Sequence, residues 1–466
     1  MTRIGAASDV TLLSHLRNCA GPKLKMFGLL PLRVEGVRMI SRRSLLMTVV
    51  IGVSSLCPNA PTFAQRSSVD KAAILKNYAN IARAVYSDSL ASAKTLQRVV
   101  DKMLAEPSAA TLAAARQVWI DARVPYLQSE AFRFTNPIVD AWEGKVNAWP
   151  LDEGLIDYVA SNDQDSDNPL FAANIIASRV VKVDGQDVDA SRITTELLRD
   201  TLHEAGGVRS NVAIGWHAIE FLLWGQDLNG TGPGAGDRPH TDYSLTACTN
   251  GNCDRRAAYL RVVTQLLVDD LAWMVGQWEP TGEAYRRIVT FPADEALVAI
   301  FSGIASLSYG ELAGERMKLG LLLHDPEEEH DCFSDNSHNS HFWDAVGIQN
   351  VYLGRYKRTD GQTVSGPSVS DLVRAKSSAA DLDVRKALEH TVARMQVIVD
   401  KAKAGSAFDQ LIAEGNIEGN RIVQDGIDAL LAQTAALRRA VTALEFQGMK
   451  VLDSASLKDA GSVKKR

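Results

Sequence analysis

Residues 69–106 read VDKAAILKNYANIARAVYSDSLASAKTLQRVVDKMLAE, with apolar residues three or four positions apart over many turns. This spacing returns the apolar side chains to one face of a helix, so the stretch predicts a long amphipathic helix. Residues 108–134, SAATLAAARQVWIDARVPYLQSEAFRF, repeat the pattern, and Ser108 is a suitable N-terminal cap. Strand-like alternation is scarce and predicts at most a small hairpin at 178–188, SRVVKVDGQDV.

Helical spacing continues on both sides of a central loop that is rich in Gly, Asp, Asn and Thr. About four long helices on each side indicate an all-α protein with two antiparallel four-helix bundles and long irregular loops. A weak internal repeat relates the halves, because each has a long helix, an acid-containing helix and an acidic loop in that order. The predicted divisions are 65–235 for the first bundle, 236–254 for the crossing loop, 255–450 for the second bundle and 451–466 for a disordered tail.

Residues 1–64 are interpreted as an N-terminal extension followed by a signal peptide that starts at about Met39. Arg42 and Arg43 precede a short apolar run, and small residues before Gln65 offer a cleavage point. The apolar run is too short for a permanent membrane span. We therefore expect export by the Sec or Tat route to the periplasm or cell envelope. The residues before Cys57 do not indicate a lipid anchor.

The 466-residue chain carries a formal net charge of −6 and no arginine-rich run, so nucleic acid is not an expected partner. Three cysteines remain after the predicted cleavage point. Cys248 and Cys253 lie in a polar turn that predicts a disulfide in an oxidising compartment. A metal half-site is the alternative, but the sequence has no second cysteine pair to complete it. Cys332 is expected to be unpaired.

His217 and Glu220 lie three residues apart in the apolar stretch GWHAIEFLLWG at 215–225. Positions i and i+3 share one helix face, so the two side chains can converge on one ligand. An imidazole beside a carboxylate suits a first-row metal ion such as iron or zinc. The spacing equally fits a buried polar pair in which Glu220 orients His217, because buried polar groups are normally paired. Spacing alone leaves both interpretations open.

Further acidic residues lie in corresponding places of the two halves. Glu130, in YLQSEAFRF, and Glu315, in YGELAGERM, have the apolar neighbours expected of inward-facing carboxylates in a bundle, although a surface charge explains either one alone. The stretch at 325–344, DPEEEHDCFSDNSHNSHFWD, fits either a metal-binding tract or a solvated acidic loop. Its candidate site residues are Glu329, His330, Asp335 and His338.

Three segments together resemble the imelysin family. GWHAIEFLLWGQD at 215–227 is similar to its GxHxxE signature. GDRPHTDY at 236–243 and EEEHDCFSDNSHNSHFWDAVGIQNVYLG at 327–354 resemble segments of its iron-regulated protein A branch. The resemblance covers about residues 70–445. It implies an exported, helical, two-bundle envelope protein that has a pocket between the bundles and a role linked to iron uptake.

The resemblance makes His217 and Glu220 the candidate metal ligands, and Glu130 is added by its position on the helix. The pocket residues that we expect are Gly215, Trp216, Glu315, Glu329, His330, Asp335 and His338. The leading hypothesis is capture of iron, as an ion or a complex, in this pocket, with zinc or another divalent metal as alternatives. An envelope iron transporter is the partner considered.

Two other function classes stay open at this point. The family name carries a peptidase label, but the chain has neither an HExxH nor an HxxEH motif. One histidine and one glutamate are too few for a hydrolytic zinc site unless distant residues complete it. A haem-binding or polymer-binding module is the other alternative, in which four tryptophans would stack on a flat ligand. These are Trp142, Trp149, Trp216 and Trp224.

Overall fold

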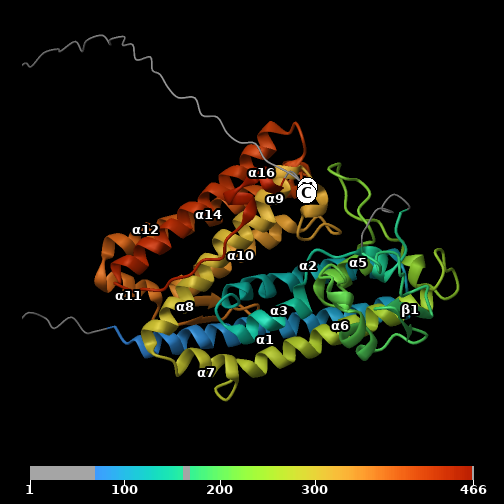
Figure 1. Ribbon diagram of the computed structural model, residues 1–466, viewed down its shortest axis with the longest axis horizontal. Coiled ribbons are helices and arrows are strands. Elements are labelled where there is room, and N and C mark those ends of the chain that lie inside the picture. The colour runs from blue at the N-terminus through green and yellow to red at the C-terminus, as the bar shows by residue number, and fades with distance from the viewer. Residues whose placement is uncertain (1–68, 161–167, 464–466) are drawn as a thin grey trace, which may run out of the picture. The chain divides into compact units, whose positions relative to one another are not determined.

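The computed structural model describes residues 69–160 and 168–463, which belong to one compact unit (Figure 1). The predicted signal peptide lies outside these ranges. Helices dominate the described residues, which contain only four short strands. The prediction of an all-α protein is therefore confirmed. The internal repeat and the boundaries of the two bundles stay predictions.

The first two long helices follow the spacing that the sequence predicts. Helix α1 (Lys71–Ala105) begins after Asp70, whose carboxylate accepts hydrogen bonds from the backbone N–H groups of Ala72 and Ala73. Helix α2 (Ala109–Ser129) begins with a capping box between Ser108 and Thr111. The apolar faces of the two helices pack along each other. A short 3-10 turn, η1 (Glu130–Phe132), follows α2.

Helices α3 (Pro137–Asn147), α5 (Gly215–Trp224) and α6 (Cys253–Gln277) pack with the first pair. Helix α6 lies against α1 and α5, although the sequence placed residues 255–450 in the second bundle (Figure 1). A disulfide joins Cys248 to Cys253, the residue at which α6 begins, and Cys332 is a buried free thiol.

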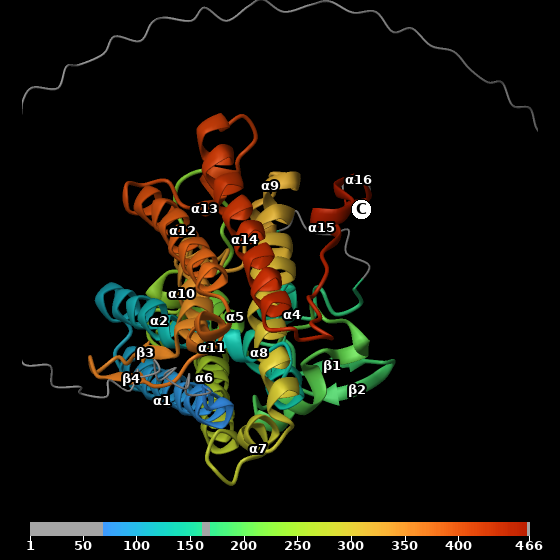
Figure 2. The same cartoon turned by 90° about the vertical axis from the view of Figure 1, so that its left-hand side faces the viewer.

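A second group of helices is formed by the C-terminal half of the chain. Helices α12 (Ser378–Lys403) and α14 (Ile417–Ala443) lie side by side, and α10 (Ser337–Leu353) packs between α12 and α2 (Figure 2). A separate apolar core that includes Met395 and Leu430 fills this group. Because α10 contacts α2 as well as α12, it joins the two groups of helices.

One long apolar helical segment runs through α8 (Ala293–Ser306), the π-helical η5 (Leu307–Lys318) and α9 (Leu319–Leu323). Within the described residues it is the one helix long and apolar enough to cross a membrane, yet 78% of its most apolar window is buried inside the protein. Packing against neighbouring helices therefore accounts for its apolar composition.

The segment after residue 450 was expected to be disordered, but its described part packs on η5. The Oγ of Ser456 donates a hydrogen bond to the carbonyl of Gly314. A Cβ on Gly310 would lie 2.6 Å from the carbonyl oxygen of Leu452. Glycines on η5 therefore let this segment approach the helix closely.

The remaining elements are short and connect the long helices. The described strands form two antiparallel hairpins, one at the site of the predicted 178–188 hairpin. The elements are α4 (Glu153–Ile156), β1 (Val180–Val183), β2 (Gln186–Asp189), η2 (Leu197–Leu202), η3 (Ala205–Gly207), η4 (His240–Tyr243), α7 (Glu283–Val289), η6 (Pro326–Glu328), β3 (Arg355–Lys357), β4 (Thr363–Ser365), α11 (Val369–Lys376), α13 (Phe408–Ile412), α15 (Ala455–Lys458) and α16 (Ala460–Val463).

Candidate metal centre

Helix α5 carries the central pair of the site, and all ten of its residues are buried. Its first residue, Gly215, has a φ of +91°, and a Cβ there would lie 2.6 Å from the carbonyl oxygen of Val146 at the end of α3. Only glycine allows both this conformation and this close approach. The helix start is therefore fixed against α3, which in turn fixes the positions of His217 and Glu220.

His217 and Glu220 form a hydrogen-bonded pair with no exposed surface. The Nδ1 of His217 lies 2.9 Å from the Oε2 of Glu220. The other carboxylate oxygen of Glu220 accepts hydrogen bonds from the backbone N–H and the Oγ of Ser334, at 3.1 and 2.6 Å. The Nε2 of His217 has no hydrogen-bond partner within the described residues. Glu220 therefore orients the ring, and one ring nitrogen remains available to a ligand.

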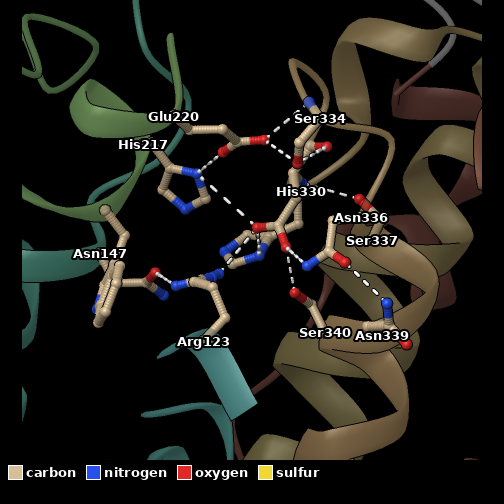
Figure 3. Close-up of polar contacts among 12 residues, drawn as sticks. Arg123, Asn147, His217, Glu220, His330, Ser334, Asn336, Ser337, Asn339 and Ser340 are labelled. Atoms are coloured by element: carbon tan, nitrogen blue, oxygen red, sulfur yellow. Dashed lines mark hydrogen bonds and ion pairs between the residues drawn. The ribbon is translucent and has the colours of Figure 1, made fainter. Parts of the chain in front are cut away.

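The loop after η6 brings a second imidazole and another carboxylate to this pair. The Oδ1 of Asp331 lies 3.9 Å from the Nδ1 of His217 and 3.4 Å from the Nδ1 of His330. One potential ligand atom from each of these three residues lies within 4.8 Å of the other two. Figure 3 shows both imidazoles beside Glu220 and Arg123. Two histidines and one aspartate therefore converge on one buried point.

Arg123 forms a buried ion pair with Asp331 and so favours the ionised form of this carboxylate. Its Nη2 lies 2.8 Å from the Oδ1 of Asp331, and neither side chain is exposed. Burial would raise the pKa of Asp331, but Arg123 and then His330 outweigh burial and hold that pKa well below its usual range. Asn336, at 3.1 Å, and the hydroxyl of Ser340 also donate hydrogen bonds to the Oδ2 of Asp331. Asp331 is thus an ionised carboxylate at neutral pH.

The two imidazoles are neutral at the same pH. Burial, and then Arg123, lower the pKa of His217 to about 3. Burial also lowers the pKa of His330 well below its ordinary value. Burial and the neighbouring Asp331 raise the pKa of Glu220. Neutral imidazole is the form that binds metal ions, so the protonation states suit a cation.

A hydrogen-bonded network extends from this centre to a second buried arginine. Arg123 donates to the Oδ1 of Asn147 at 2.6 Å, and Asn147 donates to the Oε1 of Glu130 at 2.8 Å. The other oxygen of Glu130 lies 2.6 Å from Arg316. Both oxygens of Glu130 are therefore engaged, and the structure does not bring Glu130 into the group of His217 and His330.

A cavity of about 820 Å³ lies beside the centre. Its wall includes His330 and Asn147 from the site, together with Trp149, Glu315 and Arg316. The remaining charged residues of the wall are of both signs, so the cavity is polar and not markedly basic or acidic. Because His330 belongs to both the cavity wall and the buried group, it connects the centre with the cavity.

Residues 82–437 match the family model described as imelysin. The chain belongs to the imelysin family. A protein named as an iron-regulated protein A precursor, from Parabacteroides distasonis ATCC 8503, has a similar structure, with a TM-score of 0.58 and 18% identity over 81% of this chain and 95% of that one. An imelysin-like protein from Psychrobacter arcticum 273-4 has a TM-score of 0.53 and 14% identity over 82% and 98%. None of the curated proteins compared with the chain matches it.

His217 of α5 belongs to the centre, but three of the four tryptophans that were candidates for stacking on a ligand belong to the core. Trp216 and Trp224 pack against the ring of Trp119, and Trp142 packs against Tyr86. Only Trp149 lines the cavity, with its ring centre 5.4 Å from that of His217. The four tryptophans therefore do not form a common stacking surface for a flat ligand.

The remaining residues that were expected in the pocket do not lie together in the structure. They are Glu315, Glu329, Asp335 and His338. Glu315 is exposed and lines the cavity. Glu329 and Asp335 lie outside the imidazole group and instead approach Asp409 of α13. His338 lies on α10 and belongs to neither group.

Asp331 and Arg123 were not among the site residues predicted from the sequence. Asp331 lies in the acid- and histidine-rich stretch at 325–344 and directly follows His330, but it was not among the residues chosen from that stretch. Arg123 is a single charge within an otherwise helical pattern, and nothing in the spacing of α2 indicates that it pairs with a residue more than 200 positions later.

Proposed function

We propose that this imelysin-family protein captures iron, as an ion or a small complex, at the centre formed by His217, His330 and Asp331. The observation that supports it is the convergence of two buried imidazoles and one buried carboxylate beside a polar cavity. A structural relative that carries an iron-regulated name is consistent with this role. Export to the cell envelope and transfer to an envelope iron transporter belong to the same proposal.

The residues present fit iron. Two imidazoles and one carboxylate make up the donor set that holds ferrous iron in many proteins. Glu220 would orient the ring of His217 through its Nδ1, as a carboxylate commonly does for a metal-bound histidine, and would leave Nε2 to bind the ion. Arg123 would keep Asp331 ionised and fixed in place. Each side chain of the group then has a distinct task in binding one cation.

Ferrous iron titrated under anaerobic conditions into the chain from residue 65 onward is expected to bind at one imidazole-containing site. His330→Ala is expected to weaken binding about 100-fold or more, because it removes one of three ligands. Glu220→Gln is expected to weaken binding about 10- to 100-fold, the usual effect of removing a residue that orients a ligand. Isothermal titration calorimetry measures both effects.

His390→Ala is the matched control for this titration, because His390 is an exposed histidine on α12. Its affinity should equal that of the unaltered protein. Equal iron affinity in the His330→Ala, His390→Ala and unaltered proteins would refute the proposed site.

One observation from the structure favours the alternative function, a metallopeptidase. His217, His330 and Asp331 together supply the three protein ligands that a catalytic zinc site needs. Such a site also needs a general base that can reach a bound water. Both oxygens of Glu220 are engaged, by His217 and by Ser334, so Glu220 is poorly placed for that task. We expect the zinc-loaded protein to cleave no member of a peptide library, and chelator-sensitive cleavage lost in Glu220→Gln would favour the peptidase instead.

A further inference from the structure

A second group of carboxylates lies apart from the imidazole group and draws on the same loop. Glu329 directly precedes His330, Asp335 lies just before α10, and Asp409 lies on α13. One carboxylate oxygen from each lies within 4.8 Å of the other two. We propose that Glu329, Asp335 and Asp409 form a second cation site, which binds a hard divalent cation such as Ca²⁺.

Burial without partners distinguishes this group from an ordinary acidic surface. Glu329 is 1% exposed and Asp409 is 0% exposed. The Oε1 of Glu329, the Oδ1 of Asp335 and both carboxylate oxygens of Asp409 are buried and have no hydrogen-bond partner within the described residues. Buried carboxylates are normally paired or bound to a metal, because an isolated buried charge is very costly. Unsatisfied oxygens from three different segments therefore point to a shared cation.

The surrounding charges make the group more negative. The negative charge of Asp227 contributes to raising the pKa of both Asp335 and Asp409. The negative charge of Asp331 does the same for Glu329. Burial, and then Asp409, raise the pKa of Asp335 to about 7. Within the described residues, no arginine or lysine is among the main charges that act on the three acids. A bound cation would supply the positive charge that their environment lacks.

The chemistry of the three donor groups indicates which class of cation would bind. All three ligands are carboxylate oxygens, which suit hard ions such as Ca²⁺, Mg²⁺ and Mn²⁺ better than ions that prefer nitrogen or sulfur. Ca²⁺ accepts flexible geometries and carboxylates from separate segments. Asp335 is only partly buried, so the group lies close to the protein surface. Ca²⁺ is therefore the appropriate probe.

The position of the group indicates what the cation would do. Asp409 lies on α13, which connects α12 to α14, whereas Glu329 and Asp335 flank the residues that enter the imidazole centre. An ion shared by all three would tie the α12–α14 pair to the loop that carries His330 and Asp331. The second site would thus stabilise the loop without providing a ligand to the first.

Thermal unfolding with and without Ca²⁺ tests this site in chelator-treated protein. Ca²⁺ at 100 times its dissociation constant should raise the melting temperature by about 3 °C for a domain of this size. The shift should persist in His217→Ala, which separates this site from the imidazole centre. It should vanish in Asp409→Asn, whose melting temperature without Ca²⁺ should be no lower than that of the unaltered protein, because a buried, unpaired charge is removed.

Asp428→Asn, an exposed position on α14, is the matched control and should keep the full shift. Asp335→Asn, at a partly exposed position, provides a second variant that should lose the shift even if Asp409→Asn folds poorly. The proposal is overturned if Ca²⁺, Mg²⁺ and Mn²⁺ all leave the melting temperature unchanged. It is equally overturned if the shift is as large in Asp409→Asn and Asp335→Asn as in the control.

Discussion

Arg316→Met is expected to lower the free energy of unfolding by about 3–5 kcal/mol, the usual cost of leaving a buried charge without its partner. Arg316 is 4% exposed and forms ion pairs with Glu130 at 2.6 Å, and with Glu311 and Asp344 at 2.8 Å. Methionine fills a similar volume but leaves three carboxylates without their shared cation. Denaturant unfolding followed by circular dichroism measures the difference.

An exposed ion pair provides the control for that experiment. Arg439 pairs with Asp383 at 2.6 Å, but the side chains are 58% and 47% exposed. Arg439→Met should therefore change stability by less than about 1 kcal/mol. If Arg316→Met costs no more than Arg439→Met, the buried network does not contribute to stability as described.

Gly215→Ala is expected to cost about 2–4 kcal/mol and to weaken iron binding as well. The left-handed backbone conformation alone costs about 1–2 kcal/mol for a residue with a Cβ. The new Cβ would also lie 2.6 Å from the carbonyl oxygen of Val146, which real Cβ atoms essentially never do. Relief of this clash requires the start of α5 to move away from α3. His217, two residues later, would move with it.

Gly144→Ala on α3 is the matched control, because a Cβ there would meet nothing within 4 Å. A glycine-to-alanine change inside a helix usually stabilises it by about 0.5–1 kcal/mol. The two variants should therefore shift the midpoint of unfolding in opposite directions. Equal stability of the two variants would contradict the close approach of α5 and α3.

The helices could be predicted from the sequence because the signals that define them are local. The expected helix at 69–106 corresponds to α1, and the predicted cap Ser108 begins α2. The π-helical turns of η5 were not predicted, because apolar spacing does not distinguish them from an α-helix. The packing of α6 on α1 was also missed, since spacing shows which face is apolar but not which partner covers it.

The candidate site could be predicted only in part, for the same physical reason. His217 and Glu220 are close in sequence, so their pairing follows from helix geometry. Their contacts with Asp331 and Ser334 connect segments more than 100 residues apart. Glu130 looked like a ligand because its neighbours are apolar, whereas in the fold Arg316 already pairs with it. Local sequence could not show which acids had a distant partner.

Anomalous diffraction at the iron absorption edge, from crystals grown anaerobically with ferrous iron, would locate the bound metal directly. A peak is expected within bonding distance of His217, His330 and Asp331, and no such peak is expected in crystals of His330→Ala. A diffraction map that shows iron only at Glu329, Asp335 and Asp409, or none at the imidazole centre, would contradict the proposed iron site.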